Sequence, residues 1–186
     1  MYWFKKCLVL VCPILVLLIV QSCKNDVHAD NSAGQFFDLK KYFNDESLRL
    51  KKANPLITKM AAHNKSKETR QLRIADWTTE LSLFTESDIN KPAWKASYKV
   101  ATQEGITTYN AIDTTLKTQY IIIKQQAGNV KLILIYNHIK KTLFGKVLYE
   151  ATEHLSYVPD SLYKIQKRQF VRFTGFNNYY IKGLFN

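Results

Sequence analysis

The half of the chain that follows Trp94 alternates between apolar and polar residues at the period of a β-strand. In the first such stretch, residues 94–100, the apolar side chains fall on one face and two lysines on the other. Six further stretches end at short turns rich in Gly, Pro, Asn and Asp; they are 106–111, 117–126, 130–138, 146–158, 163–174 and 179–185. Because parallel neighbours need a connection of about a dozen residues or more, these short turns predict an antiparallel meander.

Two of these strands are apolar on both faces. Tyr120–Ile123 and Leu132–Ile135 carry consecutive large apolar side chains. A strand of this composition is typical of a sheet whose two faces are both covered. We therefore expect these central strands to be buried from both sides.

The residues before Trp94 predict two helices and a hairpin. From Gln35 to Ala53, large apolar residues and Ser47 recur every three or four positions, which places them on one stripe of a helix. Asp76 is suited to cap a second helix with Trp77, Leu81 and Phe84 on one face. Between the helices, 56–62 and 70–74 read as strands joined by the polar turn 63–69. The fold class we predict is α+β, with a curved antiparallel β-meander sheet packed on two N-terminal helices.

The first 22 residues resemble a bacterial lipoprotein signal peptide. Lys5 and Lys6 precede an apolar run of 14 residues, Cys7 to Val20, which is short for a membrane-spanning helix. Ser22 then precedes Cys23, the residue expected to be lipidated after cleavage. We expect residues 23–34 to be a flexible tether and residues 35–186 a single α+β domain. The expected location is the cell envelope, by lipid anchor and at the outer membrane, with both the periplasmic and the surface face compatible with the signal.

The chain is strongly basic, with a formal net charge of +12. Much of this charge lies in the predicted hairpin, where Lys59, Lys65, Lys67 and Arg70 are the cations expected near the turn. A basic patch attracts anions, and in the envelope these are lipid headgroups or acidic glycans, whereas nucleic acid is not an expected partner. The other interpretation is a solvated surface that serves solubility alone.

No motif indicates catalysis, and we expect no cofactor, no metal site and no catalytic residue. The sequence lacks G-x-S-x-G, a phosphate-binding glycine loop and H-E-x-x-H. Glu150 and His154 share a face of one predicted strand, but four residues separate them by roughly 13 Å, too far to share a metal. After cleavage and lipidation no free thiol would remain, because the cysteines are Cys7, Cys12 and Cys23.

Three segments together resemble a family of lipid-anchored lipoproteins from the Bacteroidota; they are Phe36–Phe43, Glu86–Trp94 and Tyr157–Tyr163. The resemblance implies an anchored envelope protein and carries no activity. Thr114 in Asp113-Thr114-Thr115 and Ser161 in Asp160-Ser161-Leu162 resemble the O-glycosylation signal of exported proteins of that phylum. We expect a non-enzymatic binding or scaffold module for an anionic envelope polymer, a lipid headgroup or a partner protein. The alternative is a carrier of a lipid or other apolar ligand in a cavity between sheet and helices.

Overall fold

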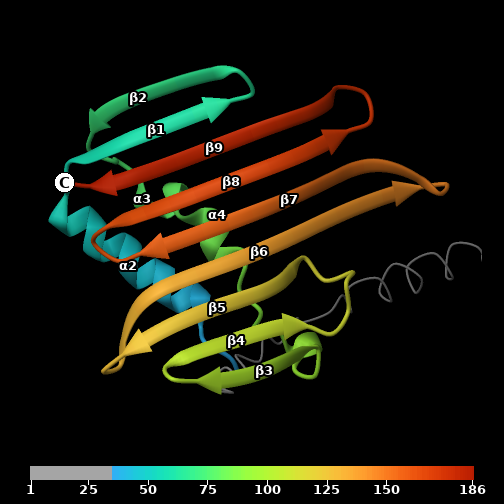
Figure 1. Ribbon diagram of the computed structural model, residues 1–186, viewed down its shortest axis with the longest axis horizontal. Coiled ribbons are helices and arrows are strands. Elements are labelled where there is room, and N and C mark those ends of the chain that lie inside the picture. Colours follow the sequence, from blue (N-terminus) through green and yellow to red (C-terminus); the bar gives the residue numbers. More distant parts are fainter. Residues whose placement is uncertain (1–34) are drawn as a thin grey trace, which may run out of the picture. The chain divides into compact units, whose positions relative to one another are not determined.

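One antiparallel sheet of nine strands carries the fold (Figure 1). The computed structural model describes residues 35–186, which lie in one compact unit. The strands are β1 (Ile57–His63), β2 (Ser66–Leu72), β3 (Tyr98–Gln103), β4 (Ile106–Ala111), β5 (Thr118–Gln126), β6 (Asn129–Leu143), β7 (Lys146–Val158), β8 (Leu162–Val171) and β9 (Gly175–Phe185). Their order across the sheet is β2-β1-β9-β8-β7-β6-β5-β4-β3. Strands β3 to β9 are therefore a meander, and the β1–β2 hairpin extends it beside β9, which confirms the predicted fold class.

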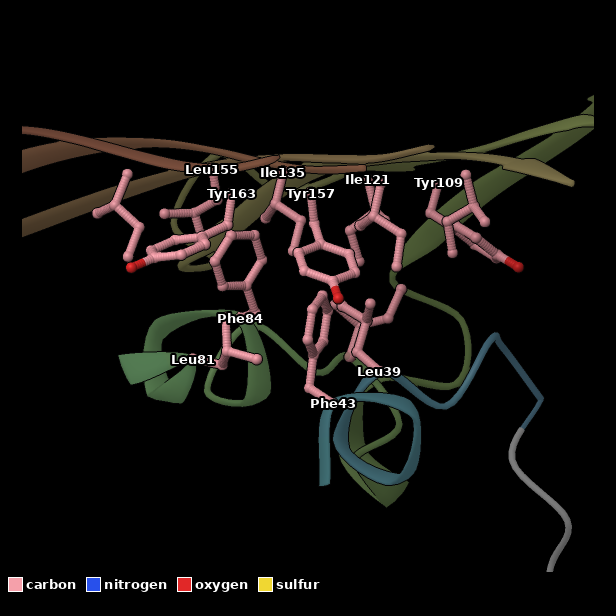
Figure 2. Close-up of a cluster of buried hydrophobic side chains, with 14 of the residues drawn as sticks. Leu39, Phe43, Leu81, Phe84, Tyr109, Ile121, Ile135, Leu155, Tyr157 and Tyr163 are labelled. Carbon is pink, nitrogen blue, oxygen red and sulfur yellow. The ribbon is translucent and has the colours of Figure 1, made fainter. Parts of the chain in front are cut away.

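The helices lie on one face of this sheet (Figures 1 and 2). They are α2 (Leu39–Ala53), the short α3 (Trp77–Glu80) and α4 (Ser82–Thr85), and the 3-10 turn η1 (Pro92–Trp94). Asp38 caps α2, since its side chain accepts a hydrogen bond from the Lys41 backbone N–H at 2.7 Å. The predicted stripe is confirmed, because the buried residues of α2 include Leu39, Phe43, Ser47 and Leu50.

Aromatic rings fill the space between the helices and the sheet (Figure 2). Phe43 of α2 lies 4.8 Å from Phe84 of α4 and 5.2 Å from Tyr157 of β7, measured between ring centroids. At the other side of this layer, Trp77 stacks on Phe185 at 5.7 Å. Such contacts add to the free energy gained by burying the rings themselves. The helices and the sheet are thus held together by interlocking side chains.

Gly183 allows one of these rings to approach the backbone. A Cβ atom at this position would lie 2.0 Å from the ring of Tyr163, its cross-strand partner. Only glycine leaves room for Tyr163 to lie across β9 and reach Glu80 below the sheet, to which its hydroxyl donates at 2.6 Å.

Several element boundaries differ from the sequence predictions; among them, β6 extends to Leu143, β8 ends at Val171 and β9 already begins at Gly175. The hairpin turn is Asn64-Lys65 rather than 63–69, and β2 already begins at Ser66. The first residues of β2 are polar and show no alternation, and pairing with β1 orders them as an exposed edge strand. The second predicted helix is interrupted at Leu81, in a stretch whose Thr and Ser residues favour turns. The strand predicted to start at Trp94 starts at Tyr98, after η1.

Candidate functional site: the open face of the sheet

The face of the sheet opposite the helices, here called the open face, has no helix against it among residues 35–186 (Figure 2). The sequence predicted that both faces of the central strands would be covered. In the structure Ile121 and Ile135 are buried on the helix side, whereas Ile122 and Leu134 on the open face are only half-buried. That expectation is therefore wrong for the described residues. Neighbouring side chains on the sheet provide the partial cover that the sequence attributed to a second layer.

A row of rings crosses the open face at right angles to the strands. The register pairs Tyr120 with Tyr136, Tyr136 with His154, His154 with Gln166 and Gln166 with Tyr180, on strands β5, β6, β7, β8 and β9. Tyr120 and Tyr136 stack with their centroids 5.3 Å apart, and the His154 ring lies 4.7 Å from Tyr136. Tyr136 therefore has a ring packed on each side, Tyr120 from β5 and His154 from β7, and the row brings two tyrosine hydroxyl groups and an imidazole to the open face.

The charge of the open face is positive. Paired residues of an antiparallel sheet point to the same face, so the register identifies the side of every strand residue. The cations on the open face are Lys67, Lys99, Lys124, Lys140, Lys164, Arg168 and Lys182. Glu150 is the one acid at a strand position of this face in the described sheet.

Glu150 is itself engaged by a histidine. His138 lies on the neighbouring strand, and its Nε2 is 3.0 Å from Glu150 Oε1. This hydrogen bond, helped by the charges of Lys140 and His138, holds the pKa of the Glu150 carboxyl below its ordinary value. His154, which is on the same strand as Glu150, is therefore not its partner, and the partner His138 comes from β6.

A groove of about 560 Å³ lies where the ring row meets the strands β7, β8, β9 and β1. Side chains from four strands converge there; the polar ones include Thr152, His154, Gln166, Arg168, Asn178 and Tyr180. A second hollow of about 210 Å³ adjoins the groove and is lined by Glu150, Phe170 and Phe176. Arg168 borders both the groove and this hollow. The groove presents hydrogen-bond donors and one guanidinium, which is suited to an oxygen-rich anion.

The structure divides the four cations predicted for the hairpin. Lys59 points to the helix side, where its Nζ lies 2.7 Å from Glu80 Oε2. Arg70 is cross-strand from Lys59 on that same side and forms an ion pair with Glu68. Lys67 lies on the open face, and Lys65 is in the exposed turn. The expectation of one shared hairpin surface is corrected, because strand alternation sends these residues to opposite sides of the sheet.

The two predicted glycosylation residues lie in exposed turns, as the sequence analysis expected of their positions. Thr114 follows Asp113, whose carboxylate accepts from the Thr115 backbone N–H at 2.8 Å. Ser161 follows Asp160, which is held by Arg49 at 2.7 Å. Glycosylation at these residues stays a prediction, and Cys23 lies outside the described residues.

Three carboxylates missed by the sequence analysis lie on the helix side of the sheet. Glu153 is 1% exposed and is paired with Lys167 at 3.0 Å, and Asn137 donates to it at 3.1 Å. Glu46 accepts from Tyr157, and Glu80 from Tyr163. Burial, followed by these hydrogen bonds to carboxylates, raises the pKa of both tyrosines.

These buried carboxylates have partners that satisfy them. Arg49 contacts Glu46, and Lys59 contacts Glu80, so each of these three carboxylates has a nearby cation. Within residues 35–186 no three His, Cys, Asp or Glu side chains are placed to hold a metal ion. No helix in this part of the chain has the length and apolar character needed to cross a bilayer. Comparison of the chain with protein-family models, curated proteins and solved structures finds no match.

Proposed function

We propose that the protein is a non-enzymatic binding module of the cell envelope, held by a lipid on Cys23, and that its open face binds an acidic glycan. The observation that carries this proposal is the charge of that face, on which seven cations stand against one acid that is already paired with His138. A partner with many negative charges would meet attraction at six of the nine strands, β2, β3, β5, β6, β8 and β9.

The ring row favours a glycan over single-stranded nucleic acid. Nucleic-acid-binding sheets use free aromatic faces on which bases stack. Here Tyr136 lies between the rings of Tyr120 and His154, so both of its faces are engaged, and the two tyrosines add hydroxyl groups to this face. Together with Gln166 and Asn178 in the groove, they match the hydroxyl groups of a polysaccharide, while Arg168 matches its acid groups.

The alternative function, a carrier of an apolar ligand, needs space between the sheet and the helices. At this interface Leu39, Phe43, Phe84 and Tyr157 are each no more than 1% exposed, and they contact one another across it. The packing there favours a structural core over a ligand cavity.

Neutralising the centre of the open face tests the proposal. The full chain, extracted from membranes, is measured on immobilised polygalacturonate as wild type and as Lys164→Gln/Arg168→Gln/Lys182→Gln. Each cation contributes about 1 kcal/mol at an anionic surface, so the triple variant should bind roughly 100-fold more weakly. Neutral dextran should not bind either protein.

The matched control removes three exposed cations that lie outside the strands, two on α2 and one next to η1, as Lys40→Gln/Lys52→Gln/Lys95→Gln, with the same change in net charge. It should bind like the wild type. An equal loss in both triple variants would show that only net charge matters and would refute a site on the open face. Tighter binding of single-stranded RNA than of polygalacturonate would replace the glycan with nucleic acid.

A further inference from the structure

One end of the sheet carries exposed aromatic side chains. The β6–β7 hairpin ends in Leu143 and Phe144, which are 52% and 93% exposed, and the β8–β9 hairpin carries Phe173 at 87% and Phe176 at 61%. Phe144, Phe173 and Phe176 are the three exposed phenylalanines of residues 35–186. We call this end of the sheet, formed by residues 139–149, 168–178 and the turn Asn64-Lys65, the tip edge.

The three hairpins of the tip edge lie side by side (Figure 1). The Arg172 backbone N–H donates to the Leu148 carbonyl at 2.9 Å, which joins the β8–β9 turn to β7. The Asn64 backbone N–H donates to the Asn178 carbonyl at 2.9 Å, which joins the β1–β2 turn to β9. The β6–β7 hairpin, whose turn contains Phe144, extends beyond the β8–β9 turn (Figure 1), and the pairing of β7 with β8 already ends at Tyr149 and Val171.

Neither burial nor backbone preference explains a phenylalanine at position 144. Phe144 and Gly145 have φ of 48° and 72°, the left-handed pair of a two-residue hairpin turn. Such turns favour Asn, Asp or Gly at the first position, and a bulky residue there is unusual. A residue that breaks the local rule without gaining burial is a mark of function.

The two hairpin segments that carry these phenylalanines are positively charged, and the acid next to them, Glu150, which lines the hollow beside Phe176, is paired with His138. Segments 139–149 and 168–178 contain no Asp or Glu, and their cations are Lys140, Lys141, Lys146, Arg168 and Arg172. All five are exposed, and the Arg168 guanidinium lies 5.2 Å from the Phe176 ring. Exposed aromatic residues surrounded by Lys and Arg match the boundary of an anionic bilayer, where rings enter the headgroup layer and cations meet phosphate.

We propose that the tip edge docks onto a bilayer containing anionic lipids, with Phe144 and Phe173 inserted between headgroups and the five cations on the lipid phosphates. This docking orients the sheet, and it shares Lys140 and Arg168 with the open face, whereas Phe144 and Phe173 belong to the tip edge. A negatively charged membrane is the occupant that both the apolar and the cationic features fit. A protein partner is the competing occupant.

The test places a tryptophan at either end of β6. Phe144→Trp reports on the tip edge, and Ala127→Trp reports on the opposite end at the same position of a turn with nearly the same φ of 48° and 76°. Strand β6 has 15 residues, so the two turns are roughly 50 Å apart, farther than lipid quenchers reach from one membrane surface. The full chain is bound to vesicles of phosphatidylcholine with phosphatidylglycerol. The comparison of the two tryptophans holds whichever segment of the chain binds the vesicle.

Brominated phosphatidylglycerol should quench the added fluorescence of Trp at 144, with a blue shift of its emission, and leave Trp at 127 unaffected. The quenching at 144 should fall when all lipids are neutral phosphatidylcholine or when Lys140, Lys141 and Lys146 are replaced by Gln. Equal quenching at the two positions, or an emission at 144 that stays at its value in water, would overturn the proposal.

A second variant tests whether a loss of quenching could come from misfolding of the hairpin. Phe144→Asn supplies the residue that the turn prefers, so the hairpin is expected to be retained. In the variant Phe144→Asn/Phe173→Trp, quenching of Trp at 173 should be weaker than in Phe173→Trp alone. Unchanged quenching would show that Phe144 takes no part in docking. None of these readouts involves polygalacturonate, so failure here leaves the glycan proposal standing, and the reverse also holds.

Discussion

The two turns that bound β6 have nearly the same backbone and opposite surface chemistry. Ala127-Gly128 and Phe144-Gly145 share the left-handed pair of φ angles. The first turn belongs to an end of the sheet whose other turns are Glu104-Gly105 and Pro159-Asp160-Ser161, with polar and acidic residues. The second belongs to the tip edge, with phenylalanines and cations. Equal backbones show that turn geometry did not demand a phenylalanine, so its chemistry at the tip edge needs another reason.

The largest expected effect is on the free energy of unfolding, and it distinguishes the buried Phe84 from the exposed Phe144. Phe84 is 0% exposed and packs on Phe43 and Tyr157, so Phe84→Ala should lower the free energy of unfolding by about 3–5 kcal/mol. Phe144→Ala should change it by less than about 0.5 kcal/mol, as at most surface positions. Urea unfolding of both variants measures the difference. A comparable loss for Phe144→Ala would mean that the ring stabilises the fold and would remove the contrast between the two ends.

A smaller effect is expected from giving both turns the residue that their backbone favours. Phe144→Asn and Ala127→Asn should each raise the free energy of unfolding by up to about 1 kcal/mol, because asparagine tolerates positive φ. Thermal unfolding of the two variants and of the wild type gives the comparison. Gains of similar size would confirm that the backbones are equivalent. Destabilisation by Phe144→Asn alone would show that the phenylalanine makes contacts that keep the hairpin folded.

The smallest expected effect is a change in the pKa of an acid near one end of the sheet. Glu150 is held by His138, and Asp160 by Arg49. Since hydrogen bonding to His138 lowers the pKa of Glu150, the stabilisation from this pair is present above the ordinary carboxyl pKa and is lost as pH falls through the lowered value. His138→Gln should move the pKa of Glu150 up towards its ordinary value, as followed by NMR titration.

Asp113 provides the internal control for that titration. Its pKa is lowered by hydrogen bonds from Thr115, which His138 does not contact, so it should titrate identically in both proteins. A Glu150 pKa that does not change in His138→Gln would show that the lysine charges alone lower it.

The structure confirms more of the predicted secondary structure than of the predicted site. The α2 stripe and the meander follow from periodicity within single segments, which is why Leu39, Phe43 and Leu50 are buried as expected. The hairpin cations were grouped by nearness in sequence, and the structure separates Lys59 from Lys67 by sending them to opposite faces. The open-face cations, such as Lys164 and Lys182, are far apart in sequence and meet only through the register of β8 with β9.

The sequence alone determined that the chain after Trp94 forms an antiparallel meander, because alternation and short turns are local properties of the chain. It also determined that the chain is basic. Only the tertiary structure decided which side of the sheet the helices cover, since Ile121 and Ile122 are equally apolar and nothing local distinguishes their faces. It likewise decided the pairing of Glu153 with Lys167 and the assembly of the tip edge from three hairpins, because these depend on contacts across strands.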